Sequence, residues 1–463
     1  MTDSDSDKVK RVLALDPLSR RQFLKRAGLA GAAIGFGGAI VGCGDSTTTT
    51  TAAEGTATSA TTAVTVGEEM GREVKVGWVT MTTGPLASLS EPDDFLLAQA
   101  KAAVGDGLVI NGKKHPITWV VKDSQSDSNR AAQVAGDLIT GDQVDLMMTG
   151  MTPIVCNPVA DQCEANGMPL VSYGAPWQAW FFGRNGDPAV GFEWAYHFFW
   201  GAEDMIAVYT GLWDMFETNK TVGVLWPNDP DGLAMADPVN GFPPVMGEMG
   251  YKIVDPGRYT NLTEDYSSII SQFKAENCEI VTGLMIAPDF PTFWSQAQQQ
   301  GFNPKAVTMG RAILVRPDME AVGDSGNGLC TEAWWASTHP FTSSLTGNTC
   351  MEQAKAWEDE KGTGYNGSLG LTGAAFEVAI DALKRTTDID DPASIRDAVK
   401  ATDLQTILGP INFSTGPVPN ISKTPLVGGQ WQQGGEWPWS LVVVNNDAYP
   451  SIPKSGELIP LGG

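Results

Sequence analysis

The sequence predicts an α/β protein with two doubly wound parallel-sheet lobes, and three observations support this fold class. From about residue 73, short apolar runs alternate with amphipathic stretches, and strands that alternate with helices form parallel sheets with helices on both faces. The same pattern starts again near residue 221. Roughly 390 residues follow residue 73, which is more than one compact core usually holds, so two lobes are expected.

The first set of elements covers residues 74–172. Its strands are expected where short apolar runs occur, and its helices where apolar residues follow helical spacing. The last of its helices is expected to begin at Pro158, because proline favours the first helical turn. The expected strands are 74–79, 117–121, 144–148 and 169–172, and the expected helices are 92–104, 130–139 and 158–166.

The second set begins at residue 221, and a largely helical region follows it. Thr263 is the expected cap of a helix whose apolar residues follow helical spacing over 266–273. Asp391 and Pro392 are expected to open the last helix, because a capping residue stands directly before proline there. Strands are expected at 221–226, 251–254, 279–285, 306–309, 408–413 and 440–445, and further helices at 351–360, 371–384 and 392–400.

Residues 1–43 have the organisation of an export signal. Arg20 and Arg21 precede an apolar run at 27–41, which is shorter than the roughly 20 residues that span a bilayer. Residues 19–25 resemble the twin-arginine export motif, and residues 40–43 resemble a bacterial lipobox with Cys43 as the lipidated residue. We therefore expect a protein that is exported in the folded state and anchored outside the cytoplasmic membrane by lipid alone. The alternative is an N-terminal amphipathic helix with a chance cysteine.

The stretch after Cys43 is rich in Thr and Ala and has no apolar period. Such a segment buries too little surface to offset its ordering entropy. Residues 44–72 are therefore expected to form a flexible tether.

The charge of the chain argues against several classes of function. With 30 basic and 54 acidic residues the formal net charge is -24, so nucleic acid is not an expected partner, because binding it requires a basic face. The three histidines, His115, His197 and His339, lack metal-ligand spacing and are expected at the surface or packed in the core. We find no phosphate-binding loop, nucleophile elbow or dinucleotide fingerprint. No metal or cofactor is expected, and an enzyme is not expected either.

Five cysteines remain if Cys43 is lipidated, and an oxidising compartment permits disulfides. Cys330 and Cys350 bracket a short segment and form the expected pair. Cys156 and Cys163 lie about 10 Å apart along an ideal helix, so they can be bridged only if the helix starts between them.

Several motifs along the chain resemble one family. They are the loop TGPLA at 83–87, the segment GMPLVSYGA at 167–175, the loop at 222–232, the helix start DYS at 265–267 and the strand GPINF at 409–413. In this order and spacing they resemble the type I periplasmic solute-binding proteins, specifically the leucine/isoleucine/valine-binding family of ABC importers.

The resemblance implies two lobes joined by three hinge crossings, which close on a small solute. The crossings are expected near Trp200, Trp334 and Leu408. The first lobe would then comprise residues 73–200 and 334–408, and the second 201–333 and 409–463. The implied partners are a small solute and an ABC permease in the cytoplasmic membrane, and the protein is expected to be a monomer.

The resemblance also places the ligand in the loops after the strands. Two positions depart from the amino-acid binders: Pro153 and Pro176 stand where hydroxyl residues are usual, and proline offers neither a hydroxyl nor an N–H group. Each lost hydrogen bond to a charged group costs about 1–3 kcal/mol. The expected ligand-binding residues are Thr83, Thr152, Pro153, Tyr173, Ala175, Trp177, Asp231 and Arg311.

Arg311 and the tryptophans favour a particular solute. Arg311 stands where amino-acid binders often carry Glu, and its guanidinium suits a carboxylate. Trp177 follows the ligand loop and suits a flat or apolar body. The expected solute is an apolar or aromatic compound that carries a carboxylate. Arg311 in a structural ion pair and Asp231 as a turn-forming residue stay open, as do two other functions: an amino-acid receptor with a rearranged grip, and a sensor that presents ligand to a membrane kinase.

Overall fold

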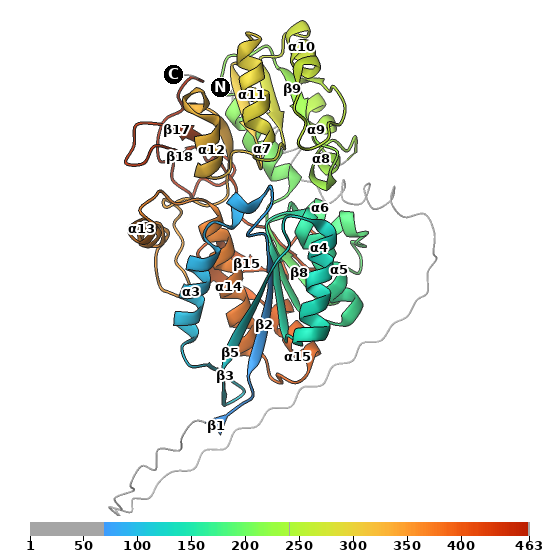
Figure 1. Cartoon of the computed structure of the whole chain (residues 1–463), viewed down its shortest axis with the longest axis vertical. Helices are drawn as coiled ribbons and strands as arrows, with labels where there is room; N and C mark the ends of the chain where they lie inside the picture. The colour runs from blue at the N-terminus through green and yellow to red at the C-terminus, as the bar shows by residue number, and fades with distance from the viewer. Residues whose placement is uncertain (1–68, 240, 462–463) are drawn as a thin grey trace, which may run out of the picture. The chain divides into compact units, whose positions relative to one another are not determined.

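The computed structural model describes residues 69–239 and 241–461 (Figure 1). These residues form an α/β protein with two mostly parallel sheets, one in each lobe, which confirms the predicted fold class. The predicted export arginines Arg20 and Arg21 and the lipidation site Cys43 lie outside the described residues. Within the described ranges, no helix combines the length and the apolar character that crossing a bilayer requires.

The sheet of the first lobe has six strands in the order β16-β8-β7-β6-β2-β5, and all its neighbouring strands are parallel. The four strands predicted in residues 74–172 are all present, whereas β8 and β16 were not predicted. The strands are β2 (Val74–Thr80), β5 (Ile117–Asp123), β6 (Leu146–Gly150), β7 (Leu170–Tyr173), β8 (Ala195–Phe198) and β16 (Ile421–Ser422).

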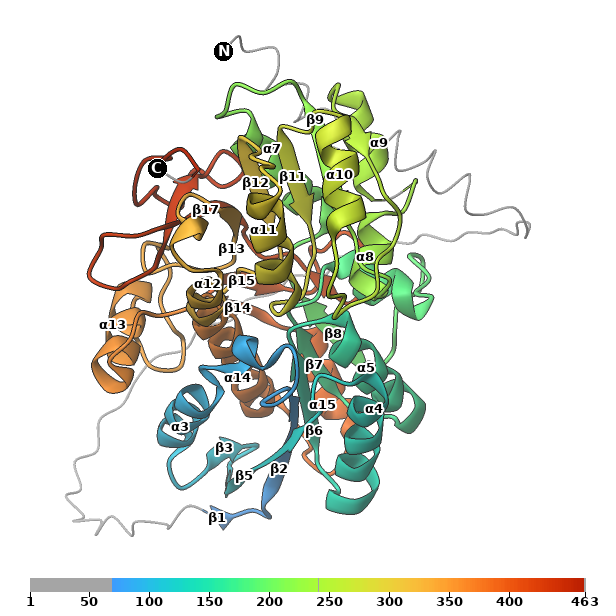
Figure 2. The same ribbon diagram turned by 45° about the horizontal axis from the view of Figure 1, so that its top comes forward.

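Helices cover both faces of this sheet, as Figure 2 shows. One face carries α4 (Ser128–Asp137) and α5 (Pro153–Asn166). The other carries α3 (Asp93–Val104), α14 (Ser368–Arg385) and α15 (Pro392–Lys400). The predicted start of α15 is confirmed, because the Asp391 side chain accepts a hydrogen bond from the Ala393 N–H group at 2.9 Å. The short helices η1 (Ala87–Ser90) and α6 (Trp177–Phe181) follow β2 and β7, and α13 (Cys350–Lys361) precedes α14.

The predicted start of α5 at Pro158 is wrong. The helix begins one turn earlier at Pro153, with Thr152 as the extended residue before it, so Pro158 lies inside the helix. Both prolines suit a helical first turn, and the earlier one in the chain takes that position. Cys156 and Cys163 therefore lie on the same helix and remain free thiols.

The sheet of the second lobe has seven strands in the order β10-β9-β11-β12-β13-β17-β18. The first five are parallel, and β17 and β18 add an antiparallel edge, in which β18 was predicted as a strand and β17 was not. The strands are β9 (Thr221–Leu225), β10 (Lys252–Val254), β11 (Ile280–Gly283), β12 (Ala306–Met309), β13 (Cys330–Ala333), β17 (Val427–Gln432) and β18 (Ser440–Asn445).

Helices α7 (Ala202–Trp213) and α9 (Phe242–Glu248) pack on one face of the second sheet, and α10 (Ser267–Ala275) and α11 (Asp289–Gln299) on the other. The short helices α8 (Pro230–Met235) and α12 (Arg316–Val322) lie toward the first lobe (Figure 1). The predicted cap at Thr263 is wrong, because α10 begins at Ser267 and the Thr263 hydroxyl instead donates to the Thr260 carbonyl.

Three stretches of chain connect the lobes. The first follows β8, the second follows β13 and the third follows β16. The third crossing predicted near Leu408 therefore lies later in the chain. Residues 403–412 form a hairpin of β14 (Asp403–Thr406) and β15 (Gly409–Asn412), and Ile421 then pairs with His197 in the first sheet. Because the hairpin folds the chain back, residues 409–422 stay with the first lobe.

The tether predicted up to residue 72 also ends earlier. Strand β1 (Glu69–Met70) pairs with β4 (Lys113–His115) beside β3 (Leu108–Ile110). Arg72 forms ion pairs with Asp145, at 2.8 Å, and with Asp390, at 2.6 Å. These charged residues follow the Thr- and Ala-rich composition and belong to the folded body.

The predicted disulfide between Cys330 and Cys350 is not formed, and both residues are buried free thiols. Cys330 begins β13 in the second lobe, and its thiol donates to the Gly328 carbonyl. Cys350 begins α13 in the first lobe, and its thiol donates to the Ile407 carbonyl. The second crossing separates the two cysteines, so their spacing of twenty positions along the chain does not bring them together.

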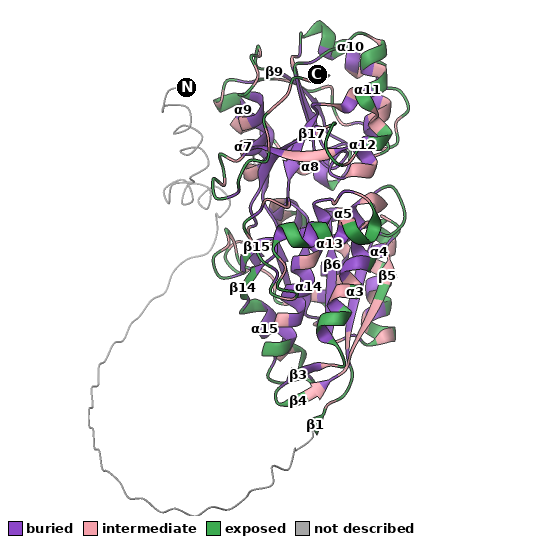
Figure 3. Ribbon diagram, turned by 90° about the vertical axis from the view of Figure 1, so that its left-hand side faces the viewer, coloured by how far each residue is buried: buried purple, intermediate pink, exposed green. Residues whose placement is uncertain are grey.

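Figure 3 shows buried strands between helices whose outer faces are exposed. One core cluster includes Ile270, Phe273, Phe293 and Trp294 and lies between the second sheet and helices α10 and α11. A larger cluster fills the first lobe and continues to the α7 side of the second lobe. This core cluster therefore includes residues of both lobes.

Candidate functional site

A small pocket lies where the loops of the two lobes meet. Its walls come from the segments after β2, β6, β7, β8, β9, β11 and β12, and from β13 and the stretch that follows it, which is the edge at which doubly wound sheets bind ligands. The free volume is about 30 Å³, room for about two water molecules, so the lobes are close together. The lining residues are Leu89, Met151, Thr152, Gly174, Pro176, Phe199, Trp200, Asp231, Leu284, Arg311, Leu314, Glu332 and Trp334.

Two lining residues hold an uncommon backbone conformation. Met151 has φ of 87° and Arg311 has φ of 66°, although neither is glycine. Left-handed backbone at such residues costs about 1–3 kcal/mol and concentrates at binding and active sites. Met151 lies in the first lobe and Arg311 in the second, so each lobe contributes one strained residue to the same pocket.

Arg311 is the centre of a buried ion-pair cluster. Its Nη1 atom donates to Asp231 Oδ2 at 2.8 Å, and its Nη2 atom donates to Asp229 Oδ2 and to the Leu284 carbonyl, each at 2.8 Å. Burial raises the pKa of Asp231, and the Arg311 charge opposes that shift. Both ends of the guanidinium are therefore occupied by this chain's own carboxylates, which is the structural ion pair that the sequence left open.

Glu332 is a functional candidate that the sequence analysis missed. It lies on β13, is 2% exposed and accepts hydrogen bonds from the Tyr209 hydroxyl and from Thr331 Oγ1. Burial raises its pKa to about 7. The available signal was an acidic residue inside the otherwise apolar run LCTEAWWA at 329–336, because Glu is almost never fully buried without a specific partner.

Three donors in the pocket walls have no hydrogen-bond acceptor: Thr152 Oγ1, Trp200 Nε1 and Arg311 Nε. All three side chains are buried, whereas the Trp334 indole faces Glu332 and opposes the rise of its pKa. A buried donor without a partner costs about 1–3 kcal/mol. A solute with acceptor atoms would recover that free energy, so these donors favour binding of an acceptor group.

The pocket brings together three of the predicted site residues, namely Thr152, Asp231 and Arg311. Tyr173, Ala175 and Trp177 are buried beside the pocket but do not line it. The Ala175 carbonyl accepts from His197 Nε2 at 2.7 Å, and Trp177 Nε1 donates to Glu203 at 3.1 Å. These residues hold the loop after β7 in place.

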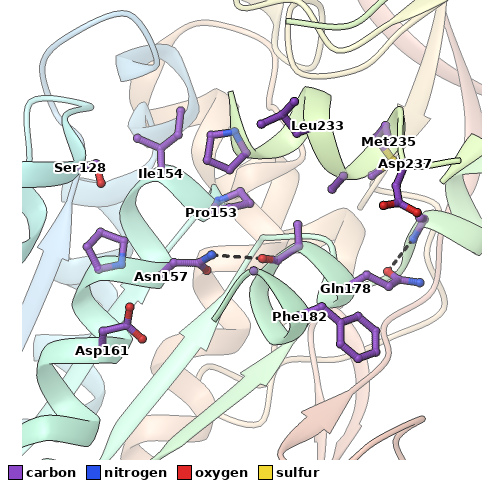
Figure 4. Close-up of a pocket in the computed structure, with 16 residues that line it drawn as sticks. Ser128, Pro153, Ile154, Asn157, Asp161, Gln178, Phe182, Leu233, Met235 and Asp237 are labelled. Atoms are coloured by element: carbon purple, nitrogen blue, oxygen red, sulfur yellow. Dashed lines mark hydrogen bonds between the residues drawn. The ribbon is translucent and has the colours of Figure 1, made fainter. Parts of the chain in front are cut away.

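The two remaining predicted residues lie elsewhere. Thr83 is exposed and hydrogen-bonds to Asp123, outside the pocket. Pro153 lines a separate groove of about 620 Å³ between α5, α6 and α8 (Figure 4).

This groove also has walls from both lobes. Ile154 and Phe182 of the first lobe face it together with Leu233 of the second, and Asn157 and Gln178 lie along its floor in Figure 4. Asn157 Nδ2 donates to the Ala179 carbonyl, and Gln178 Oε1 accepts from the Ala202 N–H group. The groove is open, mostly apolar and lacks the strained residues and the cluster of unpaired donors, so we take the smaller pocket as the candidate solute site.

A substitution at Gly174 would test whether the loops after β6 and β7 must lie close together. Gly174 has φ of 80°, and a Cβ atom there would lie 2.9 Å from the N and Cα atoms of Met151. Gly174→Ala is therefore expected to push the loops apart and to weaken solute binding about ten-fold, with a stability loss of about 1–2 kcal/mol. Titration calorimetry and urea unfolding would measure both. Gly112→Ala is the control, because Gly112 also has a positive φ of 80° but has no neighbouring atom within 4 Å. Equal solute affinity for both variants would contradict the prediction.

The fold and the pocket define a two-lobed α/β binding protein. The model of the periplasmic binding protein family matches residues 73–435, and the chain belongs to this family. It is 23% identical over 233 residues to the Leu/Ile/Val-binding protein homolog 7 of Brucella abortus, an alignment that covers 49% of this chain and 55% of the relative. The chain thus spans about half the length of the curated relatives it matches.

Solved structures show the same fold. A leucine-binding protein from Thermotoga maritima matches with a TM-score of 0.65 and 17% identity, over 81% of this chain and 99% of that one. A branched-chain amino acid transporter substrate-binding protein from Streptococcus pneumoniae, in complex with isoleucine, has a TM-score of 0.60 and 14% identity, over 84% and 99%. A solute-binding protein from Rhodopseudomonas palustris, in complex with 3,4-dihydroxybenzoic acid, has a TM-score of 0.63 and 18% identity, over 81% and 96%.

Proposed function

We propose that this protein is the extracytoplasmic solute-binding receptor of an ABC importer, which captures a small solute by closing its two lobes. The observation that carries the proposal is the interlobe pocket, in which both lobes contribute a strained residue and unpaired buried donors. Membership of the periplasmic binding protein family supports it. A lipid on Cys43 and a tether would keep the receptor near its permease after twin-arginine export. The receptor itself converts no substrate.

The solute class that the pocket favours is a compact apolar or aromatic compound with a carboxylate. Leu89, Leu284 and Leu314 supply apolar walls, and Phe199 lies against both Trp200 and Trp334. The three unpaired donors suit the acceptor atoms of a carboxylate. The Nη atoms of Arg311 are engaged, so Arg311 offers only its Nε atom to the solute. The carboxylate of the solute would therefore be bound largely by neutral donors. The ligands bound in two structures of similar fold, isoleucine and 3,4-dihydroxybenzoic acid, both carry a carboxyl group.

An amino-acid receptor with a rearranged grip is the second candidate, and Glu332 is the observation that favours it. A buried carboxylate without a cationic partner among its hydrogen bonds suits the ammonium group of an amino acid. Pro153 and Pro176 argue for a rearrangement, because they remove donors from the two loops of the first lobe.

A binding screen separates the candidates. Native mass spectrometry of the purified protein would first reveal any co-retained small molecule, and thermal unfolding would then be followed with leucine, isoleucine, benzoate and 4-hydroxybenzoate. A true ligand at 100 times its Kd stabilises the folded state by about 2.7 kcal/mol. We expect stabilisation by an aromatic or apolar carboxylate. Stabilisation by leucine with no response to the organic acids would select the second candidate, and turnover of any compound would overturn the receptor function.

The same fold also suits a sensor that presents its ligand to a membrane kinase. Uptake of the labelled ligand by cells that lack this protein decides between import and sensing. An importer receptor predicts that uptake falls at low solute concentration, whereas unchanged uptake favours the sensor.

A further inference from the structure

A polar contact crosses between the lobes directly beside the solute pocket. Leu89 of the first lobe and Leu314 of the second both line the pocket. Two residues after each leucine stands one half of an ion pair: Glu91 Oε1 lies 3.3 Å from Arg316 Nη2. In Figures 1 and 2 the segment before α3 faces the start of α12 across the boundary of the lobes.

Further side chains hold this ion pair in place. Asn366, just before α14 in the first lobe, donates to Glu91 Oε2 at 2.6 Å. In the second lobe, Arg316 Nη1 pairs with Glu320. The side chains of Arg316 and Glu91 are 12% and 24% exposed, so solvent screens the pair less than it screens a surface pair. Burial raises the pKa of Glu91, and the Asn366 and Arg316 contacts oppose that shift.

Asp318, another acidic residue of α12, also lies at this boundary. Asp318 is 5% exposed, and its Oδ2 atom has no hydrogen-bond partner. Burial raises its pKa to about 7, Ser88 of the first lobe opposes this shift by a hydrogen bond, and the Glu91 charge adds to it. Both lobes therefore bury polar groups here that water would solvate if the lobes separated.

We propose that Glu91, Asn366 and Arg316 form a latch that holds the two lobes closed over the solute pocket. Glu91 and Asn366 belong to the first lobe and Arg316 to the second, so the contact exists only while the lobes are together. None of the three lines the pocket. They are positioning residues: they act through Leu89 and Leu314 and set the closed fraction, on which the apparent solute affinity depends. This role rests on the proposed receptor function.

The test compares Arg316→Gln, Glu91→Gln and the double variant with the parent protein. Small-angle X-ray scattering of the solute-free protein measures the radius of gyration, which is expected to increase in all three variants. With 4-hydroxybenzoate and leucine as probes, stopped-flow measurements are expected to show solute release about five-fold faster than from the parent protein. The double variant is expected to release solute no faster than either single variant, because both substitutions remove the same interaction. High NaCl is expected to increase the release rate of the parent protein, and this salt dependence is expected to be absent in the variants.

Two matched variants complete the design. Arg316→Lys keeps the charge and is expected to behave nearly like the parent. Arg396→Gln removes an arginine that pairs with Glu193 and Asp397 within the first lobe, and it is expected to leave the radius of gyration and the release rate unchanged. A latch variant that matches Arg396→Gln in both readouts would overturn the proposal. If neither probe binds but the latch variants open, the latch stands and the proposed solute class fails.

Discussion

Replacing Arg311 with methionine is expected to lower the free energy of unfolding by about 3–5 kcal/mol, because it leaves buried carboxylates without a counter-charge. Arg311, Asp231 and Asp229 are 5%, 4% and 9% exposed, and both aspartates lie 2.8 Å from the guanidinium. Methionine fills much of the volume of the arginine stem, so the loss reports on charge more than on packing. Urea unfolding followed by tryptophan fluorescence would measure it.

The control for this variant is the triple substitution Arg311→Met, Asp229→Asn and Asp231→Asn. It removes all three charges together and is expected to recover most of the lost stability, since replacing a whole buried ionic group is often nearly neutral. Asparagine at position 229 also keeps the cap of α8, in which Asp229 accepts from the Gly232 N–H group at 3.0 Å. If Arg311→Met loses less than about 1 kcal/mol, or the triple variant recovers nothing, the charge cluster does not stabilise the fold.

The same cluster explains why Arg311 was easy to misread from the sequence. It follows a predicted strand, β12, so its place at the pocket could be predicted. Its partners Asp229 and Asp231 lie about eighty positions earlier in the chain, and nothing local in the sequence joins them. Sequence reasoning therefore found the right residue for the pocket and left its chemistry open between a ligand anchor and an internal ion pair.

Parallel strands were predicted well because they are buried on both faces and appear as short apolar runs. Strand β12 has the predicted bounds, and so does the antiparallel strand β18. Strand β8 was missed because it lies inside the aromatic run WAYHFFW at 194–200, which was interpreted as aromatic side chains packed beside the ligand loops. Strand β17, with its adjacent glycines Gly428 and Gly429, carries too little of the strand composition to be recognised.

Only part of the candidate site was predicted, because only some of its residues come after predicted strands. Thr152 follows β6 closely, and Asp231 lies in α8, the first helix after β9, so both could be placed at the edge where predicted strands end. Glu332 and Trp334 come from a strand and a crossing whose position depends on how the two lobes are joined. The predicted disulfide was wrong for a related reason: the second crossing puts Cys330 and Cys350 in different lobes.

A second large effect concerns pH. Between pH 5 and pH 8, the parent protein is expected to lose about 2.5 kcal/mol more stability than the Asp93→Asn variant. Asp93 begins α3 and is 3% exposed. Its Oδ2 atom accepts from the Thr80 hydroxyl, and its Oδ1 atom has no partner. Burial raises the pKa of this carboxyl from 3.8 to about 7.

The sign follows from proton binding. Below pH 4 the carboxyl is protonated in both the folded and the unfolded chain, so it contributes no pH dependence there. Between pH 4 and pH 7 the folded chain holds a proton that the unfolded chain has lost, so raising the pH favours unfolding. Asparagine cannot ionise and removes this contribution, although its amide adds a cost that does not vary with pH. Urea midpoints at several pH values would give the two curves.

Asp94→Asn is the matched control, because Asp94 is the next residue of the same helix but is exposed. The Asp94 charge contributes least to the raised pKa of Asp93, so the pH profile of Asp94→Asn is expected to stay close to that of the parent. The buried carboxyls of Asp318 and Glu332, whose pKa values are also raised to about 7, make the parent and both variants less stable as the pH rises, so only the difference between the curves reports on Asp93. Parallel curves for the parent and Asp93→Asn would mean that Asp93 is ionised in the folded protein, and that the Thr80 hydroxyl and its neighbours compensate its burial.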